Sequence, residues 1–177
     1  MIGPNLLLRA LEPSDVDILY KWENDTSIWH LSNALAPFSR FAIEQFILNS
    51  SKDIFEAKQL RMMIDWHSNG NKVLTVGSVD LFDFDPFHKR AGIGILIDES
   101  ARGKGFATEA ISLLVDYCFK TLRLHQLFCN IELSNKESIQ LFTKTGFVEC
   151  GHKKEWLQKD GHWTDELMFQ RINELIA

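Results

Sequence analysis

A short run of glycine and basic residues stands out in the middle of this chain. It reads Arg102-Gly-Lys-Gly-Phe-Ala107, follows an apolar run at 93–97 and leads into a segment with helical periodicity. Small residues let backbone N–H groups approach a ligand closely, and the N-terminus of a helix adds positive potential. With two basic side chains beside it, such a loop can bind a pyrophosphate. The same glycines also suit a tight strand-to-helix turn without a ligand, and the local sequence leaves both interpretations open.

The commoner functional motifs are absent from the sequence. There is no G-x-x-x-x-G-K-[ST], which excludes a nucleoside-triphosphate P-loop, and Gly103-x-Gly105 departs from the dinucleotide fingerprint at Thr108. No H-E-x-x-H or other metal-ligand spacing occurs among the six histidines, and no G-x-S-x-G elbow is present. We therefore expect no metal, and the loop keeps the pattern Arg-x-x-Gly-x-Ala.

A second motif follows about thirty residues downstream, at 135–147, and reads Asn-x-x-Ser-x-x-x-Phe-x-Lys-x-Gly-Phe. The two motifs, in this order and at this spacing, resemble the acyl-CoA-binding core of the GNAT superfamily of N-acetyltransferases. Residues 8–15 resemble the opening of its RimJ/RimL-type and spermidine-acetyltransferase branches, and residues 160–169 resemble their closing hairpin. The resemblance covers about residues 6–172.

The resemblance implies one GNAT-type acetyltransferase domain over residues 1–177 with a mixed α/β fold. Its central sheet would be mostly antiparallel, with helices on both faces. Two parallel strands, near 93–97 and 128–133, would splay apart to form the acyl-CoA cleft. Splayed strands leave backbone groups unpaired, and the amides of the cofactor satisfy them.

The resemblance also implies the residues that bind acetyl-CoA, the expected cosubstrate. The pantetheine arm would pair with Ile95, Leu96 and Ile97, and Asn135 would hydrogen-bond the same arm. Ser138 and Phe142 follow on the adjoining helix and complete the set. The pyrophosphate would lie on the loop formed by Arg102, Gly103, Lys104, Gly105, Phe106, Ala107 and Thr108.

The second motif departs from its relatives at one position that matters for catalysis. Many relatives carry a tyrosine that protonates the leaving thiolate, whereas this chain has Phe142, which cannot donate a proton. Ser138, one turn earlier, matches a serine discussed for this role, and water is the other candidate acid. A thiolate with a pKa of about 8.5 also leaves tolerably without an acid. Phe142 is alternatively a core residue only.

The attacking amine must be neutral, and this requirement depends on the acceptor. An amine with a pKa of about 10.4 needs about 4.6 kcal/mol to deprotonate at pH 7, whereas a peptide α-amine needs about 1 kcal/mol. Asp80 and Asp83 lie where spermidine acetyltransferases carry glutamates, so Asp80 is a candidate base acting through water. It is equally well a solvated strand carboxylate.

Two acceptors fit the family, and a protein N-terminal amine is favoured narrowly over a polyamine because no dense acidic cluster is evident. An acyl-CoA-binding protein without transferase activity is the alternative that Phe142 motivates. Aromatic residues fall in the segments that build family acceptor sites, where they line the acceptor or belong to the core. They are Trp22, Trp29, Phe38, Phe41, Phe82, Phe84 and Phe87.

Hydrophobic periodicity and turn signals place the elements that hold these residues. Strands are predicted at 6–10, 60–64, 73–84, 91–97 and 126–133, with a further strand beginning at Phe147 and a hairpin over 153–172. Helices are predicted at 13–24, from the Ser39 cap onward, at 105–122 and at 135–145. Asn69-Gly70 and 159–161 are predicted turns. The expected order is βααβββαβαββ.

Composition adds limits on partners and location. The formal net charge of −5 argues against nucleic acid, and no segment approaches 18 uncharged apolar residues, which argues against a membrane span. The N-terminus has no secretory pattern, so we expect a cytoplasmic protein, with a homo-oligomer possible. Cys118, Cys129 and Cys150 form no pair motif and are expected to be buried, reduced thiols.

Overall fold

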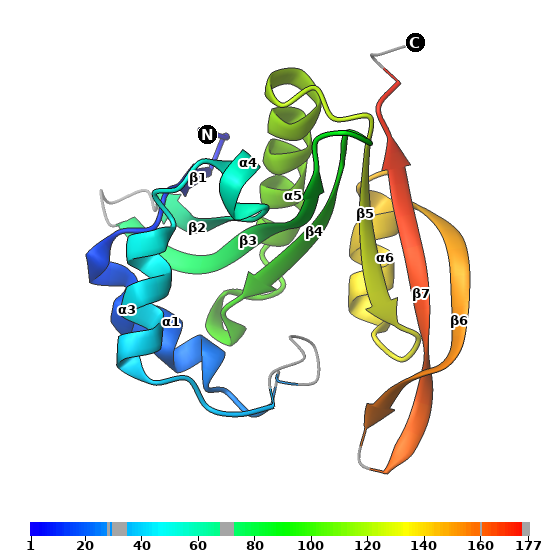
Figure 1. Ribbon diagram of the computed structural model, residues 1–177, viewed down its shortest axis with the longest axis horizontal. Helices are drawn as coiled ribbons and strands as arrows, with labels where there is room; N and C mark the ends of the chain where they lie inside the picture. The colour runs from blue at the N-terminus through cyan, green and yellow to red at the C-terminus, as the bar shows by residue number, and fades with distance from the viewer. Residues whose placement is uncertain (28, 30–34, 68–72, 160, 175–177) are drawn as a thin grey trace.

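The computed structural model describes residues 1–27, 29, 35–67, 73–159 and 161–174 (Figure 1). Seven strands form one sheet in the order β1-β2-β3-β4-β5-β7-β6. Their bounds are β1 (Leu6–Arg9), β2 (Leu60–His67), β3 (Val73–Asp85), β4 (Arg90–Ile97), β5 (Gln126–Glu132), β6 (Val148–Lys159) and β7 (His162–Ile172). Neighbouring strands are antiparallel except β4 and β5, which are parallel. The predicted mostly antiparallel sheet is confirmed.

Helices cover both faces of the sheet, as predicted (Figure 1). They are α1 (Val16–Glu23), α3 (Arg40–Asn49), the short α4 (Ile54–Ala57), α5 (Phe106–Asp116) and α6 (Lys136–Lys144). Successive side chains of a strand point to opposite faces, and β2 divides its side chains accordingly. Met62 and Ile64 belong to the core that contains α5 and α6, whereas Met63 packs with α1 and α3.

Local sequence explains where the helices begin and end. Ser39 caps α3 by accepting the Ala42 N–H at 3.1 Å, as its residue type predicts. The predicted helix at 105–122 is α-helical only to Asp116 and continues as a π-helical turn, Tyr117–Thr121. The wider turn places both residues 118 and 119 in the core. The predicted helix at 13–24 likewise opens with a 3₁₀ turn, Pro13–Asp15.

The opening motif at residues 8–15 has a structural role. Arg9 donates to both carboxylate oxygens of Asp15, at 2.7 and 2.8 Å, and to Asp65 at 2.7 Å. Thr75 donates its hydroxyl to the second oxygen of Asp65 at 2.7 Å. Because both carboxylates are buried, each requires such partners. The motif thus ties the start of the first helix to β1, β2 and β3.

The three cysteines divide between the core and the surface. Cys118 and Cys129 are buried, and burial raises the pKa of the Cys118 thiol to about 12. Cys150 is exposed, so the prediction that it is buried is wrong; it lies on β6, the edge strand, which has a neighbour on one side only.

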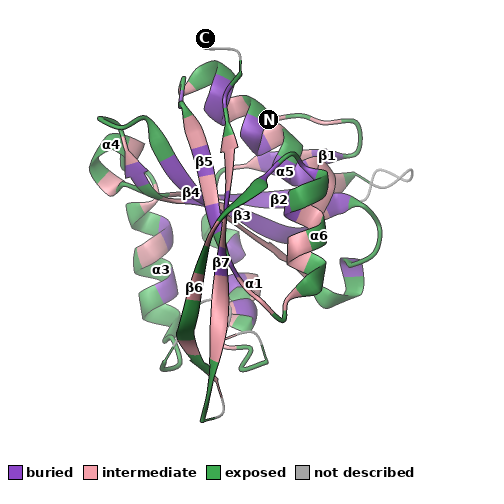
Figure 2. Cartoon of the chain, turned by 90° about the vertical axis from the view of Figure 1, so that its right-hand side faces the viewer, coloured by how far each residue is buried: buried purple, intermediate pink, exposed green. Residues whose placement is uncertain are grey.

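Asn69-Gly70 and Asp160, both predicted in turns, lie outside the described residues. The far end of the β6–β7 hairpin is solvent-exposed (Figure 2).

Candidate active site

Strands β4 and β5 separate shortly after they begin. They pair at only three positions, Arg90 with Gln126, Ala91 with Leu127 and Gly92 with Phe128. Beyond these positions β4 continues to Ile97 on the side of β3, and β5 continues to Glu132 on the side of β7 (Figure 1). The predicted pair of splayed parallel strands is confirmed. The half-buried backbone segment that includes Ile95 and Leu96 borders this split.

The loop after β4 has the geometry that an anion site requires. Gly103 and Gly105 adopt φ values of 75° and 83°, in the left-handed region that side chains other than glycine rarely occupy. A Cβ atom built on either glycine would meet no atom of the described residues within 4 Å, so the described part of the chain leaves open space in front of both. Gly105 is the N-cap residue of α5 and has no side chain that could accept a hydrogen bond from the first N–H groups of the helix. The first N–H groups of α5, those of Phe106, Ala107 and Thr108, therefore remain available to a ligand.

The basic side chains of the loop bond its own carbonyl groups. Arg102 donates from Nε to the Ile97 carbonyl at 3.2 Å, and Lys104 donates to the Ser100 carbonyl at 3.0 Å. Both side chains are exposed, so both can turn toward an anion in front of the loop. Their positive charge adds to that of the helix N-terminus.

Asp98, at the end of β4, connects this loop to the other side of the sheet. It accepts the indole N–H of Trp22 at 2.9 Å and lies 3.2 Å from the Lys21 ammonium, both on α1. Hydrogen bonds from Ser100 and Trp22 hold the pKa of the Asp98 carboxyl well below its usual range. The loop after β4 and α1 are therefore joined by an ionised carboxylate.

The second motif forms the start of α6. Asn135 caps this helix through Oδ1, which accepts the Ser138 N–H at 3.1 Å. Ser138 is half-buried on the first turn. Phe142 lies one turn further, is only 4% exposed and packs edge-to-face on Phe147 at 5.1 Å between ring centroids. This packing gives Phe142 a core role, and its contact with the cofactor stays a prediction.

Asp80 lies in a row of residues that crosses the sheet beside the split. It pairs with Arg61 of β2 on one side and with Gly94 of β4 on the other, two residues beyond the last β4–β5 pair. Arg61 Nε donates to Asp80 Oδ1 at 2.6 Å, and Arg61 also bonds Glu23 at the end of α1. Burial raises the pKa of the Asp80 carboxyl, and the Arg61 charge opposes that shift. Asp80 is thus a partly exposed carboxylate that is paired with Arg61, and not the solvated strand carboxylate considered as the alternative.

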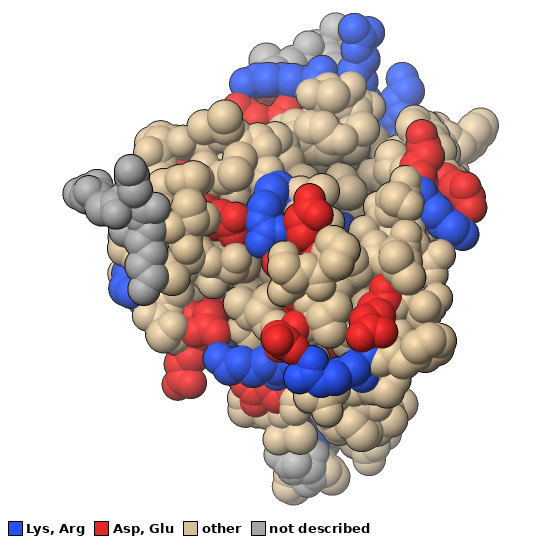
Figure 3. Space-filling view, turned by 90° about the vertical axis from the view of Figure 1, so that its left-hand side faces the viewer, with Lys and Arg blue, Asp and Glu red and all other residues tan. Residues whose placement is uncertain are grey.

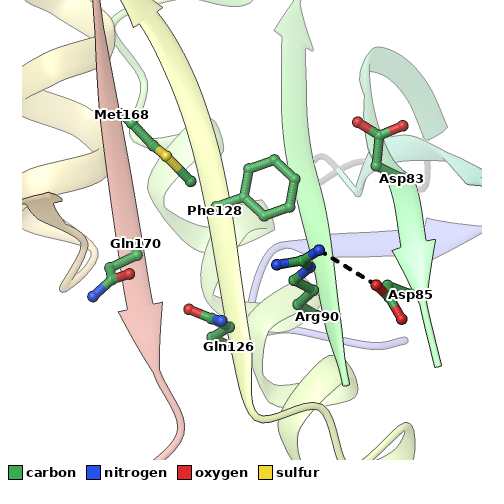
Figure 4. A pocket seen from close by; sticks show the side chains of 7 residues that line it. All are labelled: Asp83, Asp85, Arg90, Gln126, Phe128, Met168 and Gln170. Carbon is green, nitrogen blue, oxygen red and sulfur yellow. Dashed lines mark ion pairs between the residues drawn. The ribbon is translucent and has the colours of Figure 1, made fainter. Parts of the chain in front are cut away.

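A cavity of about 600 Å³ opens at the start of β4 and β5, where these two strands still pair (Figure 4). Phe128 of β5 lines it, and the Phe82 ring of β3 lies edge-to-face on Phe128 at 6.0 Å. Asp83 is exposed at a bulge with a φ of 49°, and Asp85 lies 3.4 Å from Arg90. The other lining residues are Gln126, Met168 and Gln170.

The aromatic residues noted in the sequence differ in where they lie. Trp22 and Phe84 are buried in the core, whereas Phe41 and Phe87 are exposed. Only Phe82 lies at the edge of the cavity, through its contact with Phe128. The sequence interpretation missed Arg61 and Phe128. No local signal marks either residue, because strand register alone brings them to the site.

Charge on the face that carries α1 and α3 is mixed. Acidic and basic side chains alternate there, and neither sign gathers into one large patch (Figure 3). Within the described residues no group of three or more His, Cys, Asp or Glu side chains is placed to hold a metal ion. Among the helices in the described part of the chain, none is long and apolar enough to cross a membrane.

A parallel pair of strands that splays apart, followed by a glycine-rich loop at a helix N-terminus, defines the class of fold to which the chain belongs. The chain belongs to the acetyltransferase (GNAT) domain family, whose profile matches residues 5–148. The predicted family is therefore confirmed.

Individual relatives narrow the activity. Spermidine N(1)-acetyltransferase of Vibrio cholerae is 29% identical over 167 residues, covering 93% of this chain and 91% of that protein. A crystal structure of spermidine N-acetyltransferase from Vibrio cholerae in complex with CoA and spermine has a TM-score of 0.84, with 26% identity and 97% of each chain covered. [Ribosomal protein uS5]-alanine N-acetyltransferase of Escherichia coli is 32% identical over 76 residues, covering 43% of this chain and 39% of that protein.

The chain is an N-acetyltransferase that transfers an acetyl group to an amine from a cosubstrate of the acetyl-CoA type. The alternative of a binding protein without transferase activity is therefore set aside.

Proposed function

We propose that the acceptor is the primary amine of a polyamine and that the cosubstrate is acetyl-CoA itself. The observation that carries this proposal is the extent of the likeness to spermidine N(1)-acetyltransferase, which spans 93% of this chain, whereas the likeness to the uS5-alanine enzyme spans 43%. This choice reverses the narrow preference for a peptide amine that the sequence favoured. Asp83 at the cavity supports it, because an exposed carboxylate there can attract an ammonium group of the acceptor, whereas Asp85 is paired with Arg90.

The proposed chemistry is direct transfer. The amine nitrogen attacks the thioester carbonyl carbon, the carbon–sulfur bond breaks, and the thiolate of CoA leaves. Asp80 Oδ2 has no hydrogen-bond donor among the residues that the structure describes, so it is open to a water molecule that relays the proton of the ammonium. The released thiolate takes a proton from the Ser138 hydroxyl or from water, and the second proton that the nitrogen loses as the amide forms replaces it. Holding both reactants in one split sheet supplies proximity and orientation.

The loop geometry supports the proposed cofactor site. N–H groups at the start of α5, with Arg102 and Lys104, receive the pyrophosphate, while the β4 backbone at Ile95 and Ile97 pairs with the pantetheine arm. Asn135 Oδ1 already accepts the Ser138 N–H at the start of α6, so the side-chain N–H₂ group is the one that can donate to the cofactor. The cytoplasmic location and the oligomeric state stay predictions.

A panel of amines tests the acceptor. Thiol release from acetyl-CoA, with the product checked by mass, should give a kcat/KM for spermidine at least tenfold above that for a peptide with a free N-terminal alanine. The matched control is N-terminally acetylated peptide, which offers no α-amine. A higher kcat/KM for the free peptide than for any polyamine would overturn the polyamine assignment and leave the acetyltransferase assignment intact.

A further inference from the structure

Arg61 is held between two carboxylates. It projects from β2, opposite Asp80 of β3 in the antiparallel register, and donates from Nε to Asp80 Oδ1 at 2.6 Å. Its Nη1 bonds Glu23, the last residue of α1. The guanidinium also lies over the Phe46 ring of α3, 5.1 Å from the centroid. Three separate elements therefore fix one cation in place.

The ion-pair group of Arg61, Glu23 and Asp80 lies beside the split between β4 and β5. Its row of the sheet runs from Arg61 through Asp80 to Gly94, just beyond the point where β4 and β5 separate. The next row on the same face contains Phe82, whose ring contacts the Phe128 wall of the cavity. The three charged side chains are 20 to 25% exposed, so solvent and solutes reach them.

The chemistry of the three groups is that of an occupied cation site. Two carboxylates on either side of a small space attract an ammonium group, and here a cation of the protein already fills that space. The group consequently offers one net negative charge where the carboxylates alone would offer two. A substrate ammonium that approaches must compete with a tethered guanidinium that already makes two ion pairs.

We propose that Arg61 determines the charge selectivity of the acceptor site, by occupying Glu23 and Asp80 so that polyamines of lower charge are favoured over those of higher charge. The inference rests on the proposed function, because it concerns the same acceptor. It adds a specificity-determining residue that acts by filling part of the site rather than by contacting the substrate with an attractive group.

Arg40 provides a matched control. It also pairs with one aspartate, Asp17, and lies over an aromatic ring, that of Tyr20, at 4.9 Å. Its side chain is 58% exposed, and it is not part of the row beside the split. Replacing either arginine changes the net charge equally, so a general effect of charge on the approach of cations would appear in both variants.

The experiment measures kcat/KM for putrescine, spermidine and spermine with the natural chain, Arg61→Met, Arg61→Lys and Arg40→Met. Methionine keeps the apolar stem against Phe46 and removes the charge. We expect the ratio of spermine to putrescine to rise at least tenfold in Arg61→Met and to stay within threefold of the natural value in Arg61→Lys and Arg40→Met. Acetyl-CoA affinity and the melting temperature are measured on each variant to confirm a folded cofactor site.

Glu23→Gln supplies an independent arm, which decides the question if Arg61→Met fails to fold. Removing one carboxylate leaves Arg61 with surplus positive charge, so the spermine-to-putrescine ratio should fall instead of rising. An unchanged ratio in both Arg61→Met and Glu23→Gln, or an equal rise in Arg40→Met, would overturn the inference. Absence of turnover with every amine in the natural chain would instead overturn the proposed function, so the two failures are distinguishable.

Discussion

The loop after β4 and the row of charged residues beside the split in the sheet, from Arg61 to Gly94, are two different surfaces. The loop offers backbone N–H groups in front of open space, made available by two glycines in the left-handed region. The row offers side chains that are already paired with one another, Arg61 with Glu23 and with Asp80. One surface is preorganised for a ligand, and the other must exchange protein contacts for substrate contacts.

This difference has a physical basis in what each ligand carries. A pyrophosphate is the same in every acyl-CoA, so fixed backbone donors suit it and need no adjustment. An amine acceptor varies in length and charge between substrates. Side chains can be replaced without rebuilding the strand that carries them, so selectivity is expected to reside in residues such as Arg61 and Asp80.

The largest expected effect concerns the proton on the acceptor side. Asp80→Asn should lower kcat/KM for spermidine by about 100-fold, the usual scale for loss of a general base, because the amine is almost entirely protonated at neutral pH. For the natural chain, kcat/KM should rise with pH across the neutral range. A peptide α-amine, measured with the same variant, serves as the control and should lose much less. An equal and small loss for both amines would mean that Asp80 serves only as the partner of Arg61.

The cofactor side can be tested at Gly105. Valine there would be forced into the left-handed region and would place its branched side chain where the phosphate belongs, so acetyl-CoA affinity should fall by about tenfold or more. Gly161→Val is the matched control, because Gly161 has a φ of 79° and the same open surroundings in the β6–β7 turn. Calorimetry with acetyl-CoA and with S-acetylpantetheine measures both. Equal affinity of the natural chain for the two thioesters would contradict the pyrophosphate site.

The loop after β4 could be predicted from the sequence, whereas the row through Asp80 could not. The loop and the start of α6 are local features, so the residue pattern around Gly105 and the segment that begins at Asn135 were enough to predict where the two helices begin. The row through Asp80 depends on strand register, and no pattern in the sequence links Arg61 to Asp80 or Phe128 to Phe82. The exposure of Cys150 was missed for a related reason, since only the strand order shows that β6 is an edge.

A smaller effect is expected at the leaving group. If the Ser138 hydroxyl protonates the thiolate, Ser138→Ala should lower kcat by about tenfold, less than the loss of a base, because a thiolate leaves without full assistance. Acetyl-CoA affinity should change little. Ser134→Ala is the control, since its exposed hydroxyl bonds Glu132 outside the helix. Single-turnover kinetics with an unchanged rate of acetyl transfer would remove Ser138 from the mechanism and leave water as the acid.

The smallest effect is expected for Phe142→Tyr, which adds the donor that many relatives carry. Phe142 is buried against Phe147, so the new hydroxyl must reach the split between β4 and β5 to find a partner. If it does not, the unsatisfied polar group lowers the stability of the protein by about 1–3 kcal/mol. We expect a folded variant whose melting temperature falls by no more than a few degrees and whose kcat is at least that of the natural chain. Combining it with Ser138→Ala makes the test sharper, because a tyrosine hydroxyl at the thiolate should restore part of the lost kcat. A double variant as slow as Ser138→Ala alone would show that residue 142 serves the core and has no access to the leaving group.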